Sequence, residues 1–121
     1  MTVRHLHHNA MSLASIGDRV ARQGGRGESW HFVAAALEQK AFGQLPAEAS
    51  SEPTRAILGL SAASLWWGIG RYANALAVIR AALPTATLAA VPFEHRELVN
   101  LLRRCEVDAR QGGERGHAGR V

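Results

Sequence analysis

The stretch from Ser64 to Leu76, S-L-W-W-G-I-G-R-Y-A-N-A-L, places two adjacent tryptophans directly before a G-I-G turn. On both sides of the turn, apolar side chains recur at helical spacing, which is typical of the corner between two packed helices. Gly70 is expected to end the first of these helices in the left-handed region, where the absent Cβ removes the strain. The glycines do not indicate a phosphate-binding loop, because the preceding strand, third glycine and Lys-Ser/Thr pair of such loops are missing. The stretch therefore predicts a helical hairpin.

The same helical periodicity extends over most of the chain, and no stretch alternates for long enough to predict a strand. Capping and helix-breaking residues indicate the boundaries, namely Asn9 as an N-cap, then Gly24, Gly25, Pro53, Pro84 and Pro92. The sequence therefore predicts an all-α fold of about five helices. Their expected ranges are 10–23, 28–42, 54–68, 71–83 and 93–110.

Apolar stripes predict which side of each helix is buried. In the second helix this stripe is Trp30, Val33, Leu37 and Ala41. The third helix is apolar nearly all round, so we expect it to be central. In the fifth helix the single cysteine, Cys105, is expected to be an inert buried thiol. It shares a face with Leu98, Leu101 and Leu102.

The composition indicates one soluble domain. At 121 residues, 47% of them apolar, the chain can form one core and has no room for a second catalytic domain. The longest uncharged run, 56–70, is shorter than the roughly 20 residues that cross a bilayer, so no membrane association is expected. The lone cysteine and the lack of a secretory signal favour the cytoplasm. The expected organisation is a flexible His-rich arm over 1–8, a single helical domain over 9–110 and a disordered Gly/Arg tail over 111–121.

Two parts of the sequence align when Gly24 is overlaid on Gly70. The run I-G-D-R-V-A-R-Q-G-G-R-G-E-S-W-H-F-V-A-A-A-L over 16–37 then matches A-A-S-L-W-W-G-I-G-R-Y-A-N-A-L-A-V-I-R-A-A-L over 62–83. Small residues coincide, as at Gly17 and Ala63, where two helices can cross closely. In the second helix of each copy, the overlay pairs Ser29 with Ala75, Val33 with Ile79 and Ala36 with Ala82.

This pattern resembles the tetratricopeptide repeat (TPR) family, in which a glycine turn joins a first helix to a second helix carrying an aromatic residue and A-L. The resemblance is strongest over Gly70 to Leu83, G-R-Y-A-N-A-L-A-V-I-R-A-A-L. The first copy departs from the pattern, because Arg26 replaces the aromatic residue and Ser29 replaces the alanine. The two turns are also farther apart than the roughly 34 residues of the family. The resemblance implies antiparallel helix-hairpin repeats of TPR-like type, with the helix over 93–110 as a cap.

The resemblance also implies a protein-protein interaction module, a small adaptor or chaperone that binds a helix or extended peptide of a partner protein. Stacked hairpins of this kind present one concave groove, lined by the first helix of each repeat. The groove positions carried over are Met11, Asp18 and Arg22 from the first copy, and Ile57, Leu60, Ser64 and Trp67 from the second. So short a stack also favours a homo-oligomer or an obligate partner.

Two of these groove positions have a purely structural alternative. Trp67 is a binding hot spot if it is exposed, and part of the architecture if it packs on a neighbouring helix. Asp18 and Arg22, four residues apart on one helix, form either a surface ion pair or a clamp for the end of a partner chain.

Other functions have weaker support. A net charge of +4 is compatible with a basic nucleic-acid-associated regulatory protein, but the arginines are spread along the chain, which disfavours nucleic acid as a partner. His5, His7 and His8 offer imidazole ligands for zinc or nickel, but no carboxylate or cysteine stands nearby at ligand spacing. We expect no metal and no cofactor. Paired carboxylates and catalytic triads are not recognisable, so the sequence does not predict an enzyme.

Overall fold

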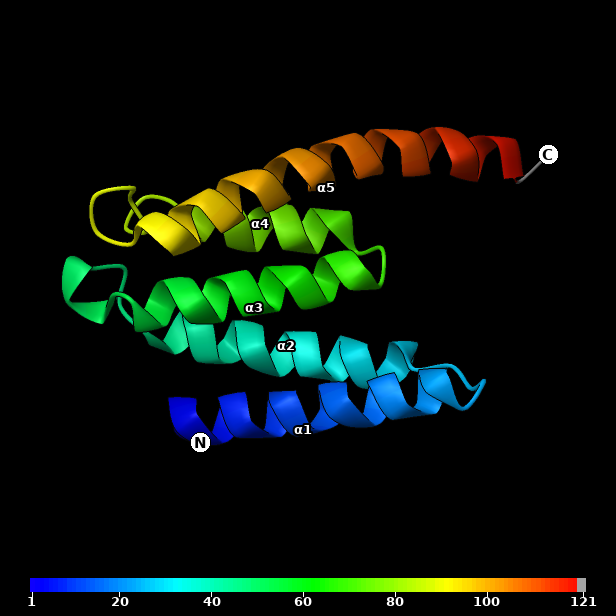
Figure 1. The fold of residues 1–121 in the computed structure, drawn as a ribbon, viewed down its shortest axis with the longest axis horizontal. Coiled ribbons are helices and arrows are strands. Elements are labelled where there is room, and N and C mark those ends of the chain that lie inside the picture. Colours follow the sequence, from blue (N-terminus) through cyan, green and yellow to red (C-terminus); the bar gives the residue numbers. More distant parts are fainter. Residues whose placement is uncertain (120–121) are drawn as a thin grey trace.

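The protein is a stack of five α-helices over the part of the chain that the computed structural model describes, residues 1–119 for the backbone and 1–112 for the side chains. The helices are α1 (Val3–Arg22), α2 (Glu28–Gln44), α3 (Thr54–Gly68), α4 (Tyr72–Ala82) and α5 (Pro92–Gly119), with a short 3-10 helix, η1 (Ala49–Ser51), before α3. Consecutive helices run antiparallel, and α1 and α5 form opposite edges of the stack (Figure 1). No strand occurs over 1–119, so the predicted all-α fold is confirmed.

The three middle helices lie within two residues of their predicted bounds. The central position of α3 is also confirmed, because α3 packs against α2, α4 and α5. It buries Trp66 together with the small residues Ala62 and Ala63, which allow its neighbours to approach closely. None of the described helices is both long enough and apolar enough to span a bilayer.

The first helix begins earlier than predicted. Thr2, not Asn9, is the N-cap, and its hydroxyl accepts a hydrogen bond from the backbone N–H of His5 at 3.2 Å. Leu6 and Ala10, four residues apart, are buried against the rest of the stack and hold the first turns in place. The prediction of a flexible arm over 1–8 is therefore wrong from Val3 onward, because Leu6 is buried in the core and Val3 packs against it.

The last helix extends beyond its predicted end at Arg110 as far as Gly119. The expectation of a disordered tail over 111–121 rested on its low apolar content, which limits packing but does not prevent a helix from continuing. No proline interrupts the run, but Gly112, Gly113, Gly116 and Gly119 are poor helix formers, so helix propensity does not explain this extension. Residues 120–121 of the expected tail lie outside the described range.

The turns of the two hairpins, α1–α2 and α3–α4, have the same geometry. Gly24 and Gly70 both adopt positive φ, 84° and 75°, as predicted for Gly70. In each turn, the backbone N–H of the second residue after the C-cap donates a hydrogen bond to the carbonyl of the residue five positions earlier than the donor, as in a Schellman motif. These bonds are Gly25 N to Val20 O and Arg71 N to Trp66 O, both at 2.9 Å. The two donors, Gly25 and Arg71, are 46 positions apart along the chain, and so are the two acceptors, Val20 and Trp66. This is the same separation as in the sequence overlay.

After the turn, the two copies have a different register. The first connection spans 23–27 and the second only 69–71, so the second helices correspond at a separation of 44 residues instead of 46. The positions that coincide and are buried in α2 and α4 are Ala34 with Val78, Ala35 with Ile79 and Glu38 with Ala82. The predicted pairs with Ser29, Val33 and Ala36 are therefore wrong.

The same shift corrects the predicted buried stripe of α2. Val33 is 46% exposed and Trp30 is also exposed, whereas Ala34, Ala35, Glu38 and Phe42 are buried. Of the predicted stripe, only Ala41 is fully buried, and Leu37 is half-buried at its edge. In α5 the prediction is confirmed, because Leu98, Leu101 and Cys105 are buried and Leu102 packs beside them.

Candidate functional site

The four predicted groove residues of α3 line two hollows, one on each side of that helix. Ile57 lies in a hollow of about 430 Å³ between α1 and α3, whose other lining residues are Val3, Arg4, His7, Thr54 and Leu58. Leu60, Ser64 and Trp67 lie in a hollow of about 320 Å³ between α3 and α5, with Gly68, Glu97, Asn100, Leu101 and Arg104. The helix α3 therefore forms the middle of a face that α1 and α5 border.

The α1–α3 hollow adjoins a buried carboxylate. Glu38 of α2 is 0% exposed, and its two oxygens each lie 2.9 Å from Nδ1 of His7. Ser61 of α3 donates a third hydrogen bond to Oε2 at 2.7 Å. Because a carboxylate only accepts, Nδ1 of His7 carries the proton, and Nε2 remains for another partner. His7 is half-exposed, so a buried charge fixes the orientation of a side chain at the edge of the hollow.

The α3–α5 hollow is bordered by Trp67, whose exposure the sequence left open. The indole Nε1–H donates to Oδ2 of Asp108 at 2.8 Å, and the guanidinium of Arg104 lies 5.9 Å from the ring centroid. Trp67 is half-buried against the core and still lines the hollow. The indole of Trp67 therefore bonds to α5 through its N–H edge, and part of the ring remains exposed at the hollow.

The three predicted groove residues of α1 do not join this face. Met11 lines a separate hollow of about 470 Å³ on α1, together with His8, Ser12, Ser15, Ile16 and Arg19. Asp18 accepts a hydrogen bond from Nε2 of His31 at 2.8 Å, and it forms no ion pair with Arg22, the partner proposed from spacing. Arg22 is exposed in the last turn of α1.

The residues of α1 that reach the face are Val3, Arg4 and His7, which sequence reasoning missed. They lie in the segment that the sequence predicts to be a flexible arm, so periodicity was no guide to which of its side chains share a helical face. The i, i+4 spacing of Val3 and His7 around the buried Leu6 is the signal that could have found them.

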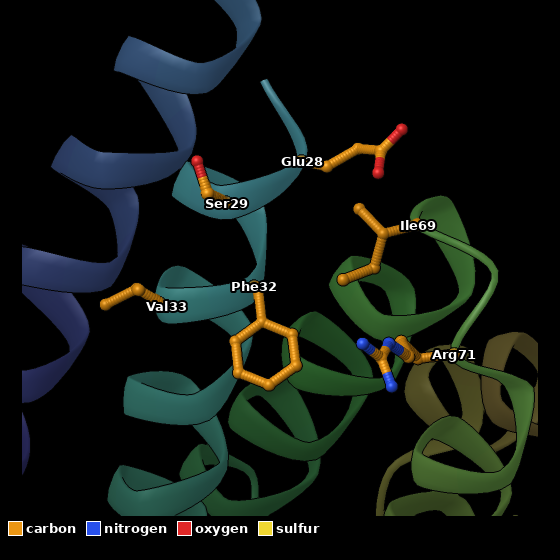
Figure 2. A pocket seen from close by; sticks show the side chains of 6 residues that line it. All are labelled: Glu28, Ser29, Phe32, Val33, Ile69 and Arg71. Atoms are coloured by element: carbon orange, nitrogen blue, oxygen red, sulfur yellow. The ribbon is translucent and has the colours of Figure 1, made fainter. Parts of the chain in front are cut away.

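A fourth hollow, of about 460 Å³, lies between the start of α2 and the α3–α4 turn. Its lining residues are Glu28, Ser29, Phe32, Val33, Ile69 and Arg71. The Phe32 ring and the Arg71 guanidinium are turned toward one another, 5.2 Å apart (Figure 2). Phe32 also packs edge-to-face on Trp66, with ring centroids 5.1 Å apart. Phe32 belongs to the first hairpin, and Trp66 and Arg71 belong to the second, so these contacts hold the two hairpins together.

Groups that could support catalysis or metal binding are dispersed over residues 1–112. No three His, Cys, Asp or Glu side chains in the described part of the chain are grouped as metal ligands would be. His7 is turned to Glu38, whereas His5 and His8 are exposed. Cys105 is buried as predicted, and burial, with a smaller effect of the Asp108 charge, raises the pKa of its thiol.

The chain matches no protein-family model, and neither the curated proteins nor the solved structures include a significant match to it.

Proposed function

We propose that this protein is a small protein-protein interaction module, an adaptor or chaperone without catalytic activity of its own. The face formed by α1, α3 and α5 binds a helix or an extended segment of a partner protein. The observation that carries this proposal is the uncovered apolar surface of α3: Ile57 is 47% exposed, and Leu60 and Trp67 are only partly covered. Apolar side chains between two hollows are typical of a surface that another chain covers.

The two matching turns support a helical repeat of the TPR type. Positive φ at Gly24 and Gly70, and the same hydrogen bond across each turn, are what two copies of one hairpin would share. In stacked hairpins the first helices of successive repeats lie along one surface, and this is the surface that partners occupy. In this protein α1, α3 and α5 would be the helices along that surface.

The two hollows favour an amphipathic segment as the ligand. The lining of the α1–α3 hollow combines the apolar side chains of Val3, Ile57 and Leu58 with the polar side chains of Arg4 and His7. The α3–α5 hollow also combines apolar groups with an amide and two charges, from Asn100, Glu97 and Arg104. A partner segment that places an apolar side chain in each hollow and hydrogen-bonding groups at their borders satisfies both.

A comparison of two surface variants tests the proposal. Ile57→Asp places a charge on the proposed face, and the control Ala77→Asp places the same charge on an exposed position of α4. Tagged wild-type protein and both variants are used to recover partners from cells of the native host, and the recovered partner is then purified and titrated. We expect Ile57→Asp to weaken binding by about tenfold or more and Ala77→Asp to leave it unchanged.

Circular dichroism of the variants distinguishes lost binding from lost structure. Equal recovery of the partner by all three proteins would contradict the proposed face. The alternative of a nucleic-acid-associated regulator is tested by gel shifts at two salt concentrations, since phosphate contacts weaken steeply with salt.

A further inference from the structure

The last described helix, α5, packs on one side only. Leu98, Leu101 and Cys105 are buried against the stack. On other sides of the helix, Phe93 is 65% exposed and Val107 is also exposed. Because α5 lies at the edge of the stack, no further helix covers this side in the described part of the chain (Figure 1).

Three arginines form a row along this uncovered side. Arg96, Arg103 and Arg110 are seven residues apart, which places them on the same side of α5 at intervals of about 10 Å. All three are exposed. Glu106 stands between the last two in sequence, yet no ion pair among the described residues involves any of the three arginines. Glu106, three residues after Arg103 and four before Arg110, offsets part of this charge, but with three arginines to one glutamate positive charge predominates along the row.

Beside this row lies a hollow of about 360 Å³ between α5 and the loop that follows α4. Leu88, His95, Arg96, Val99, Asn100 and Arg103 line it. Leu88 is 51% exposed, and a hydrogen bond from His95 Nδ1 to the carbonyl of Ala86, at 2.9 Å, ties the loop to the helix. Two arginines of the row thus stand at the border of a hollow that also offers the apolar side chains of Leu88 and Val99.

We infer that this side of α5 is a second docking surface, and that it binds an acidic amphipathic helix of a partner protein. Such a helix would place an apolar side chain on Leu88 and Val99. Carboxylates seven residues apart on it would face Arg96 and Arg103. Charge complementarity of this kind fixes the orientation of a docked helix and speeds association. The surface adjoins the α1–α3–α5 face at Asn100, but Leu88, Arg96, Val99 and Arg103 do not line that face, so variants of the row test this inference independently of the proposed function.

Charge and apolar exposure decide between this occupant and others. A symmetric dimer through this side of α5 would set one arginine row beside the other, and the repulsion disfavours a second copy of the chain. A nucleic acid would use the arginines but would leave Leu88 and Phe93 uncovered. Protein interfaces, in contrast, combine arginine with apolar side chains at their core.

Fluorescence anisotropy with synthetic peptides tests the inference. The probe is a labelled amphipathic helix with a leucine stripe and Glu residues at i and i+7, and the control peptide has Lys in place of each Glu. The variant Arg96→Glu/Arg103→Glu reverses the row, and the matched control Arg26→Glu/Arg80→Glu reverses two exposed arginines elsewhere. Both double variants change the net charge by the same amount.

We expect the acidic peptide to bind the wild-type protein and the Arg26→Glu/Arg80→Glu control alike, and to bind Arg96→Glu/Arg103→Glu about tenfold or more weakly. We also expect the Lys peptide to prefer Arg96→Glu/Arg103→Glu, as charge reversal on both sides restores complementarity. Equal loss of binding in the two double variants would overturn the inference, because net charge alone would then explain it. It would also be overturned if DNA bound through the row at the same salt concentration while the acidic peptide did not.

Discussion

The indole Nε1–H of Trp67 in α3 donates a hydrogen bond to Oδ2 of Asp108 in α5 at 2.8 Å, across 41 positions of the sequence. This bond fastens the last helix to the central helix beside the α3–α5 hollow. It also orients the part of the indole that remains on the surface. One tryptophan thus stabilises the stack and shapes the proposed binding face.

Trp67→Phe removes this donor and keeps most of the aromatic packing. We expect a loss of about 1 kcal/mol in the free energy of unfolding, because the half-buried Asp108 carboxylate loses a hydrogen bond. Urea denaturation of Trp67→Phe, Asp108→Ala and the double variant measures the coupling between the two residues. If the two single effects simply add, the hydrogen bond does not stabilise α5.

His7→Ala leaves the buried Glu38 carboxylate with Ser61 as its remaining hydrogen-bond donor. We expect destabilisation of about 2 kcal/mol, which is less than the roughly 3–5 kcal/mol for breaking a fully buried pair, because water can reach the place of the half-exposed imidazole. The double variant His7→Ala/Glu38→Gln should recover part of this loss, since no unpaired charge is then buried.

Urea denaturation again provides the measurement, with His8→Ala as the control. His8 is exposed on the same helix, and its replacement should change stability by no more than about 0.5 kcal/mol. Equal stability of His7→Ala and His8→Ala would show that Glu38 does not need the imidazole.

Gly70→Ala forces a Cβ into the left-handed backbone conformation of the α3–α4 turn. The position has φ of 75° and open space around an added Cβ, so backbone strain is the reason to expect a loss of about 1 kcal/mol or more. Gly68→Ala is the matched control, because this glycine is helical and also has open space around it. Alanine there should raise the melting temperature slightly. An unchanged melting temperature for Gly70→Ala would contradict the role of this glycine in the turn.

Cys105 should resist thiol reagents in the folded protein. Burial, and to a lesser degree the charge of Asp108, raises the pKa of the thiol, so the reactive thiolate is scarce as well as inaccessible. We expect labelling by a disulfide reagent at pH 8 to be slow in buffer and complete in denaturant. Fast stoichiometric labelling of the native protein would show that α5 opens readily.

The same pKa shift gives a direction for the dependence of stability on pH. The folded protein holds the Cys105 proton to higher pH than the unfolded chain does. The resulting stabilisation is therefore complete below the unfolded pKa and decreases as the pH rises above it. Measuring the free energy of unfolding of Cys105→Ala across the same pH range tests this contribution. The variant has no thiol, so its stability should fall less at alkaline pH than that of the wild-type protein. Parallel pH profiles for the two proteins would contradict it.

The sequence by itself determined the features that depend on local chemistry. A glycine at positive φ, prolines at helix boundaries and an apolar run between them act within a few residues, and they place α2, α3, α4 and the Gly70 turn correctly. The four predicted groove residues of α3 lie beside hollows on two sides of that helix, and their part in binding a partner stays a prediction.

Only the tertiary structure decided which side of α2 is buried and where α1 begins. Alanine-rich α2 shows little contrast in hydrophobicity around its axis, so the longer first connection and the close packing of small residues set its register. Glu38 is buried because His7 and Ser61, from two other helices, satisfy its carboxylate. Asp18 likewise bonds His31 of the next helix instead of Arg22 of its own. These partners are far apart in sequence, and periodicity within one helix carries no information about what the neighbouring helix presents.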